Sequence, residues 1–298
     1  MKLIKLSLYL FVNVLFFASC GSASHHFYAT DEGNLLALRE EKDLKVSAGY
    51  TPHLNSLPGN NINAQIGYSP IKHLGIHGSY FRIRNSFTGA EDIEKNVYQY
   101  NFSGAIGGYY FKPAKAKEIF GDDEDGLTSF ESATEGKGLL FDGYVGYSRG
   151  AVNNFYFGET GKVELDFQKF YVQGGFHIFL DKVGASFTLR GTQLSYLDSS
   201  IASGKLSASQ LRKIKIIEEN NPFFFLESAL KISIGKPTAP IRGYLTLAGV
   251  YDFGDVFLEV QPSTMQFGVT ADIDYLFSKK EKTKKKSSKK KRRSSRKN

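Results

Sequence analysis

A regular alternation of apolar and polar residues near the end of the chain limits what it can fold into. In the segment 266–277 every second residue is apolar, namely Phe267, Val269, Ala271, Ile273, Tyr275 and Phe277. The positions between them are polar or glycine, except for Leu276. Successive side chains of a β-strand point to opposite faces, so this segment predicts a strand with one apolar and one polar face.

Similar segments follow one another from Leu44 to Phe277 and predict ten strands. They begin near Leu44, Ile62, Leu74, Tyr98, Phe141, Phe170, Val183, Phe224, Arg242 and Gln266. No run after the N-terminal segment approaches the ~20 apolar residues that a membrane-spanning helix needs. A hydrophobic content of 41% suits a barrel in which only every second strand residue faces lipid. The sequence therefore predicts an all-β, up-and-down antiparallel transmembrane β-barrel of ten strands over residues 44–277. Eight strands remain an alternative, because the first two segments and the ninth are the weakest.

The predicted connections alternate between short and long. Short turns around Ser69, Asp181 and the segment 236–241 join strands two and three, six and seven, and eight and nine. The other connections have about ten residues or more, as in a barrel with a tight periplasmic rim and long outer loops. The acidic segment 112–138 is the exception and is predicted to be an inserted loop. With ten strands, both chain termini are expected on the periplasmic side.

The long connection 199–221 has apolar residues at helical spacing, Leu206, Leu211, Ile214 and Ile217. Ser207 is a suitable helix cap. We therefore expect a short amphipathic helix that packs over the rim of the barrel.

The polar faces of the strands are predicted to fill the interior. Barrels of about eight strands enclose a space that side chains fill, rather than an open channel. The inward set carries charges of both signs, and charges in a confined interior persist when they are paired. It comprises His73, His77, Asp142, His177, Arg190, Glu227, Lys231, Asp272 and Asp274. We expect a polar plug of ion pairs and hydrogen bonds here, and no catalytic residues, metal site or cofactor.

The first 19 residues have the features of a secretory signal peptide, with two lysines before an apolar run that ends in small residues. The only cysteine of the chain follows, and Phe17-Ala18-Ser19-Cys20-Gly21 resembles the lipobox of bacterial lipoproteins. The resemblance implies cleavage before Cys20 and acylation of its thiol, although Phe17 stands where Leu is usual. An ordinary signal peptide is the alternative. Residues 20–43 are then expected to form a lipidated, flexible linker.

Glycine-aromatic patterns recur along the predicted barrel. They lie in the stretches 39–50, 64–68, 73–76, 107–110 and 143–150, which contain sequences such as Gly107-Gly108-Tyr109-Tyr110. These stretches resemble uncharacterised outer-membrane β-barrel proteins of Gram-negative bacteria, over about residues 32–277. The resemblance implies a barrel in the bacterial outer membrane and carries over no catalytic residues.

Residues 278–298 form a basic tail with 13 Lys or Arg residues, one Glu and no apolar residue, so the tail is expected to be disordered. The tail's positive charge exceeds the net charge of +8, so the rest of the chain is mildly acidic. Outer-membrane lipids are the expected partners of the barrel. Anionic headgroups or peptidoglycan are expected partners of the tail. A merely solubilising tail is the alternative, and nucleic acid is not expected as a partner of an exported protein.

These features favour a non-enzymatic, lipid-anchored outer-membrane barrel with a structural or surface-interaction role. One alternative is a soluble periplasmic barrel that binds a lipid in an apolar lumen, as lipocalins do, with the two faces of every strand inverted. Another is an outer-membrane hydrolase with acid and histidine pairs near the rim. Alternation alone is compatible with either orientation of the faces. The preference for a membrane barrel rests on tyrosines near strand ends, glycine-rich strands and the asymmetry of the loops.

Overall fold

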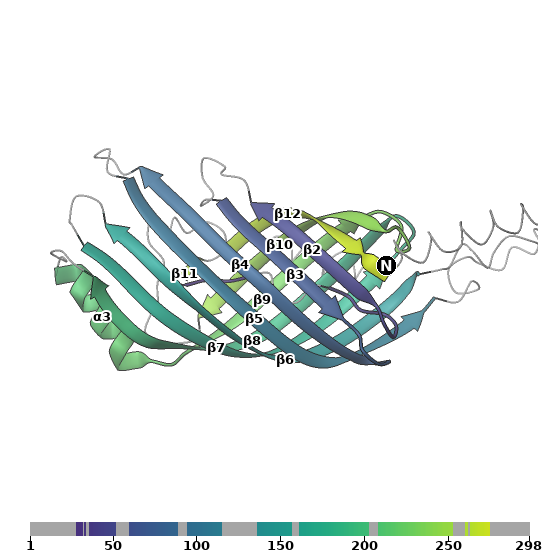
Figure 1. Ribbon diagram of the computed structural model, residues 1–298, viewed down its shortest axis with the longest axis horizontal. Helices are drawn as coiled ribbons and strands as arrows, with labels where there is room; N and C mark the ends of the chain where they lie inside the picture. Colours follow the sequence, from purple (N-terminus) through teal and green to yellow (C-terminus); the bar gives the residue numbers. More distant parts are fainter. Residues whose placement is uncertain are drawn as a thin grey trace, which may run out of the picture.

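The computed structural model contains a closed barrel of ten strands, as predicted (Figure 1). It describes residues 28–31, 33, 36–51, 60–88, 94–114, 136–156, 161–202, 208–252, 260–261 and 263–274. The barrel strands are β2 (Leu44–Thr51), β3 (Asn60–Tyr68), β4 (Leu74–Thr88), β5 (Glu94–Pro113), β6 (Gly138–Tyr156), β7 (Gly161–Phe179), β8 (Val183–Ala202), β9 (Phe223–Ile234), β10 (Ile241–Asp252) and β12 (Ser263–Asp272). The predicted signal peptide, Cys20, the acidic part of the 112–138 loop and the basic tail lie outside the described residues.

Each barrel strand pairs with its neighbour in an antiparallel arrangement, and β12 closes the ring. Val269 of β12 pairs with Gly243 of β10 on one side and with Ala48 of β2 on the other. Two short strands outside this order, β1 (Tyr28–Ala29) and β11 (Val260–Gln261), form a separate parallel pair. Closure leaves no unpaired barrel edge, which is the condition for a sheet to cross a bilayer.

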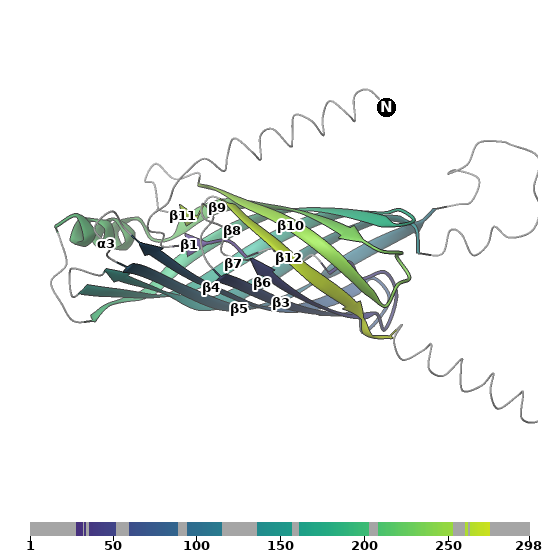
Figure 2. The ribbon, with the colours of Figure 1, turned by 90° about the horizontal axis from the view of Figure 1, so that it is seen from above.

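The two ends of the barrel differ. One end, which we call the turn rim, carries the short turns between β3 and β4, β7 and β8, and β9 and β10. The opposite end, which we call the loop end, carries the helix α3 (Ala208–Asn220), between β8 and β9 (Figure 2). No helix in the described part of the chain is long and apolar enough to cross a membrane.

Near the turn rim, the strands expose apolar side chains and turn polar ones inward. On β7, Phe170 and Val172 face outward and are 51% and 64% exposed, whereas Gln173 and His177 face inward and are buried. Equivalent outward side chains surround the barrel. We call this set the apolar belt: Ile66, Ile76, Phe102, Ile106, Phe141, Val145, Phe170, Val172, Leu189, Phe224, Ile232, Phe267 and Val269.

Toward the loop end this arrangement reverses. On β7 the buried inward residues become apolar, and the outward ones, such as Glu164 and Asp166, are charged. The strands are long enough to contain both regions, since β5 and β8 have 20 residues each, about twice the ~9–11 needed to cross a bilayer. The expected long loops between β4 and β5 and between β6 and β7 are therefore mostly strand. The alternation is inverted there, because the apolar side chains face inward and form a core inside the barrel, while the polar ones face outward.

This loop-end core includes one face of α3. Ile214 and Ile217 of the helix are buried with Leu165, Phe167 and other inward side chains, whereas Leu211 is exposed. The predicted amphipathic helix is confirmed, and its apolar face packs on the barrel. The N-terminal residue of the described chain, Tyr28, belongs to the same core.

Candidate functional site

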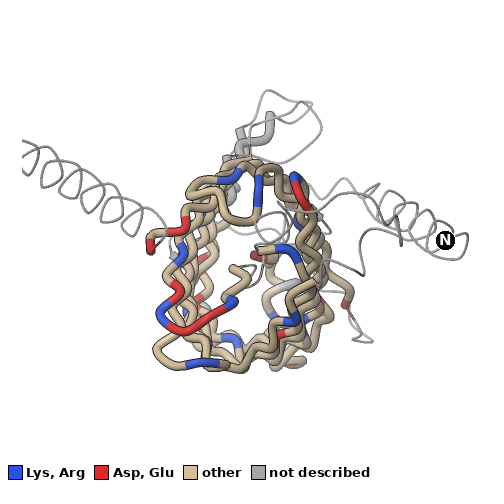
Figure 3. The backbone as a smooth tube through the Cα atoms, turned by 90° about the vertical axis from the view of Figure 1, so that its right-hand side faces the viewer, with Lys and Arg blue, Asp and Glu red and all other residues tan. Residues whose placement is uncertain are grey.

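The described residues of the segment 28–39 lie inside the barrel, and we call them the luminal segment. Figure 3 looks along the barrel and shows chain enclosed by the ring of strands. Tyr28, Asp31, Leu36 and Leu38 are all buried. For its described residues from Tyr28 onward, this corrects the expectation of a flexible linker over residues 20–43, whereas residues 20–27 lie outside the described part of the chain. The segment has no alternating pattern, but its apolar and acidic side chains match the interior that the strands build around it.

The luminal segment runs from the loop end to the turn rim. Tyr28 stacks on Phe225 of the loop-end core, with ring centroids 5.3 Å apart. Leu38 is buried at the other end with Leu140 and Phe179, the latter at the turn-rim end of β7. The first and last barrel strands share the turn rim, as expected. The described chain reaches β2 through the lumen from the loop end, and the two termini themselves, which were expected on one side, lie outside the described residues.

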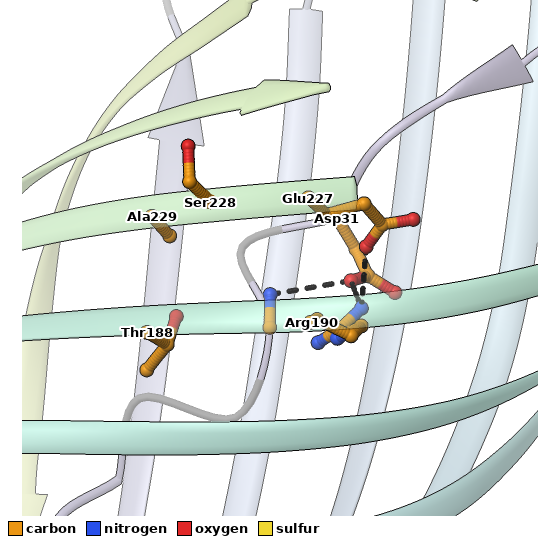
Figure 4. A pocket seen from close by; sticks show the side chains of 7 residues that line it. Asp31, Thr188, Arg190, Glu227, Ser228 and Ala229 are labelled. Carbon is orange, nitrogen blue, oxygen red and sulfur yellow. Dashed lines mark hydrogen bonds and ion pairs between the residues drawn. The ribbon is translucent and has the colours of Figure 1, made fainter. Parts of the chain in front are cut away.

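Asp31 is the centre of an ion-pair network that joins the luminal segment to the wall (Figure 4). Lys169 Nζ donates to Asp31 Oδ2 at 2.9 Å, and the Arg190 guanidinium pairs with Asp31 Oδ1. Arg190 Nη1 also lies 3.0 Å from Glu227 Oε2, and Glu227 accepts a hydrogen bond from the Tyr28 hydroxyl. Lys169 donates to the Tyr28 hydroxyl oxygen at 3.2 Å, which closes the ring of contacts.

The four charged groups of this network are almost completely buried, and they balance as two acids and two bases. A buried charge is tolerated when its partners satisfy it, and the loss of one partner leaves the others uncompensated. Neutral side chains complete the set: Gln173 Oε1 accepts from Arg190 Nε and Nη2 at 3.2 and 3.1 Å, and Asn101 Nδ2 lies 3.2 Å from Asp31 Oδ2. The network therefore fixes the segment at mid-barrel.

The space next to this network is small. A cavity of about 10 Å³ is lined by Asp31, Gly33, Thr188, Arg190, Glu227, Ser228 and Ala229, and it has room for about one water molecule. Gly33 is required for this fit, because its φ is +69° and a Cβ there would lie 2.8 Å from Arg190 Nη2. The segment thus fills the lumen at this level.

A second set of contacts holds the segment at the turn rim. Lys45 Nζ donates to the Ala37 carbonyl at 2.5 Å and pairs with Asp43 Oδ2 at 2.6 Å. The same carboxylate accepts the Arg39 backbone N–H at 2.9 Å, and the Arg39 side chain lies 3.7 Å from Asp272 Oδ2. The luminal segment is therefore fastened at both ends and in its middle.

A cluster of His77, Asp142, Tyr144 and His177 faces the lumen between the network and the turn rim. His177 Nε2 lies 2.9 Å from Asp142 Oδ2, and neither side chain is exposed. The His77 ring packs edge-on against Tyr144, with centroids 4.4 Å apart. Within the described chain, several polar atoms of this cluster have no hydrogen-bond partner, including both His77 ring nitrogens and the Tyr144 hydroxyl. Groups of this kind normally bind ordered water. No three His, Cys, Asp or Glu side chains of the described residues are placed to hold a metal ion.

The structure places seven predicted interior residues at buried, inward-facing positions of the wall: His77, Asp142, His177, Arg190, Glu227, Lys231 and Asp272. Asp142 joins His177, and Arg190 joins Glu227. Lys231 Nζ lies apart from both pairs, 3.8 Å from the Tyr244 ring centroid and 3.2 Å from Thr270 Oγ1.

The predicted positions of His73 and Asp274 are wrong. β4 begins only at Leu74, so His73 is exposed in the preceding turn at φ 68°, with Nδ1 3.0 Å from the Tyr109 carbonyl. Asp274 follows the end of β12 and is exposed, and its Oδ2 accepts the Leu44 N–H at 2.7 Å. Partial burial raises the pKa of Asp274, the Leu44 N–H opposes this, and the neighbouring carboxylates add to the rise.

Several residues that hold the luminal segment, in the network or at the turn rim, were not predicted as interior residues. Lys45 and Lys169 lie on the polar faces of their strands, so the alternation itself indicates that they point inward. Tyr28 and Asp31 precede the first alternating segment, and nothing local in the sequence indicates that they are inside a barrel.

No protein-family model matches this sequence, and no curated protein is similar enough to it to count as a relative. The geometry alone therefore guides the functional inference.

Proposed function

We propose that this chain is a non-enzymatic, lipid-anchored outer-membrane β-barrel with a structural or surface-interaction role, closed by its own luminal segment. The observation that carries the proposal is the distribution of side chains on the two faces of the strands. Apolar side chains surround the outside near the turn rim, and charged and amide side chains fill the inside at the same level.

The apolar belt is far more extensive than the exposed hydrophobic surface of a typical soluble protein. Single exposed hydrophobic residues are ordinary, but large contiguous apolar patches indicate contact with a partner or a membrane. Here they recur around the ring, with Phe102 on β5, Val145 on β6 and Val172 on β7 each more than half exposed. A continuous ring of this kind fits the hydrocarbon core of a bilayer.

The belt also disfavours the lipocalin-like alternative. A soluble barrel that binds a lipid needs an apolar lumen and a polar outer surface. In this barrel, the belt level has buried Lys169, Arg190 and Glu227 inside. The two largest apolar clusters of the described interior lie toward the two ends, where α3 and the luminal segment pack into them, and only small clusters such as Ala105, Tyr144 and Tyr171 lie between. The lumen therefore lacks the apolar pocket that this alternative requires.

The orientation follows from the sequence and the topology together. A signal peptide at residues 1–19 supports export, and short turns are typical of the periplasmic rim of outer-membrane barrels. The loop end then faces the exterior. Because the chain enters the lumen at that end, an acyl chain on Cys20 would insert into the adjacent, outer leaflet.

Asp142 and His177 are the pair that most resembles a catalytic acid and base, but their burial does not favour an enzymatic role. The two side chains are fully buried in the wall of a filled lumen, and a general acid or base must reach the proton that it transfers. A structural role in the polar interior suits the pair better.

Fractionation of cells that express the full chain tests the proposal. We expect recovery with the outer membrane, resistance to alkaline carbonate and a shift in gel mobility on boiling. A Cys20→Ser variant should lose lipid labelling but keep all three properties, because strands rather than the lipid hold the barrel in the bilayer. Release of the Cys20→Ser variant by carbonate would contradict a spanning barrel.

A further inference from the structure

Three arginines occupy outward-facing positions just beyond the apolar belt. Arg82 and Arg84 follow each other on the outer face of β4, and Arg149 lies on the outer face of β6. The register connects them, because Arg149 pairs with Phe102 of β5 and Phe102 pairs with Tyr80 of β4. Adjacent strands are about 4.8 Å apart, so long side chains from β4 and β6 can converge over β5.

The belt ends at the level of these arginines, since its residue Phe102 is the register partner of Arg149. On the same three strands, the outward residues toward the turn rim are apolar and about half exposed, namely Ile76, Ile106 and Val145. A cation at this height extends its charged end into the headgroup layer while its stem stays on apolar surface. The three guanidiniums are thus at the depth of lipid phosphates in the leaflet at the loop end.

The three guanidiniums have no acidic partner among the side chains that the structure describes. Among the described residues, none of the three forms an ion pair, and Arg82 Nε is buried without a hydrogen-bond partner. Among the described side chains, the nearest acids on the outer face are on β7. Glu164 pairs with Lys162 at 2.6 Å. Asp166 is the diagonal neighbour of Arg149, because Gln168 is the register partner of Arg149, but the two side chains form no ion pair. The charge on β4 and β6 is therefore available to a ligand.

Aromatic rings form a ladder between the arginines. Tyr80 and Phe102 have centroids 4.8 Å apart, Phe102 and Tyr100 6.4 Å, and Tyr100 and Tyr98 5.8 Å. Tyrosines with a polar tip and an apolar ring are suited to the boundary between headgroups and acyl chains. The ladder gives the surface an apolar floor beneath a cationic rim.

We propose that Arg82, Arg84 and Arg149 bind the phosphate of an anionic lipid in the leaflet at the loop end. The part of the lipid next to the phosphate, either a sugar or the start of an acyl chain, would lie against the Tyr98–Phe102 ladder. The proposal rests on the membrane-spanning role proposed above. Guanidinium groups form bidentate, charge-assisted hydrogen bonds to phosphate, and three of them around one site more than neutralise the charge of about −1.5 to −2 on a phosphomonoester.

Native mass spectrometry of the full chain in detergent, titrated with dilauroyl phosphatidate or dilauroyl phosphatidylcholine, tests this site. We expect the wild type to bind phosphatidate at least about tenfold more tightly than phosphatidylcholine, and the Arg82→Gln/Arg84→Gln/Arg149→Gln variant to lose that preference. The matched control neutralises three exposed lysines elsewhere, Lys182→Gln/Lys215→Gln/Lys236→Gln, and should keep the preference.

An equal loss in both triple variants would overturn the proposal, since it would indicate general attraction to positive charge. Displacement of the lipid by equimolar inorganic phosphate would overturn the assignment to a lipid. The arginine variant should keep the boiling shift and the carbonate resistance of the wild type. Loss of the lipid preference alone can then be distinguished from failure of the barrel proposal. If that variant does not fold, Arg149→Gln alone, at an exposed position, should weaken phosphatidate binding several-fold, and an unchanged affinity would overturn the site.

Discussion

Removal of the Asp31 carboxylate should release the luminal segment and open the barrel. Asp31 pairs with both Lys169 and Arg190, and all three side chains are buried. In an Asp31→Ala variant, Glu227 is the only acid left in the network for these two cations. Loss of one partner from a buried ion pair typically costs about 3–5 kcal/mol, because the remaining charge stays desolvated.

This cost acts on docking of the segment rather than on the barrel, whose strand pairing does not involve Asp31. A loss of about 4 kcal/mol reduces the ratio of docked to released segment by roughly 10³, since 1.4 kcal/mol is a factor of ten. The segment also keeps its contacts at Tyr28 and at the Lys45 side chain, so release should be intermittent.

Conductance across a planar lipid bilayer measures the opening. The wild type should be closed, and Asp31→Ala should show frequent transient openings while it keeps the boiling shift of a folded barrel. Asp274→Ala is the matched control, because this carboxylate is exposed at the rim, and it should stay closed. A folded Asp31→Ala barrel with no more openings than the wild type would refute the view that this network keeps the lumen closed.

Three further perturbations test other parts of the structure. Gly107→Ala should impair folding, because a Cβ there would lie 1.9 Å from the Gly143 carbonyl, whereas Gly174→Ala, with no atom within 4 Å, should leave the urea-unfolding midpoint unchanged. Ile217→Ala should cost about 2–5 kcal/mol of unfolding free energy by leaving a cavity in the loop-end core, and Leu211→Ala on the exposed side of α3 should cost little; equal losses would contradict the packing of the helix. An epitope tag inserted ahead of Tyr28 should bind antibody on intact cells, and a tag at the C-terminus should bind only after permeabilisation; the reverse pattern would contradict the direction in which the segment crosses the lumen.

The sequence predicts the barrel well because each strand has an apolar outward face and a polar inward face over the length of the belt. Outward residues from Phe141 to Val145 or from Phe170 to Val172 must be apolar, and their neighbours along the strand face a polar lumen. That rule yields ten strands and the inward positions of Arg190 and Glu227. The rule stops where the apolar belt ends, so the extensions of β4 to β8 beyond the belt were expected to be loops.

The position of the luminal segment could not be predicted from the sequence, for a different reason. Asp31 makes contacts with residues more than a hundred positions later in the chain, and no local periodicity encodes such contacts. The errors at His73 and Asp274 are local, because alternation does not show at which residue a strand begins or ends. A pair such as Lys169 and Arg190, two inward cations on neighbouring strands beside one acid, is a signal that a further acid is needed inside the barrel.

Fluorescence quenching by lipids with brominated acyl chains tests the central claim most directly. In a Cys20→Ser background, a fluorophore is attached to Val172→Cys in the belt or to Gln168→Cys, on the same face of the same strand toward the loop end. The spanning barrel predicts strong quenching at position 172 and weak quenching at position 168, whereas equal and weak quenching at both would contradict insertion of the belt into a bilayer.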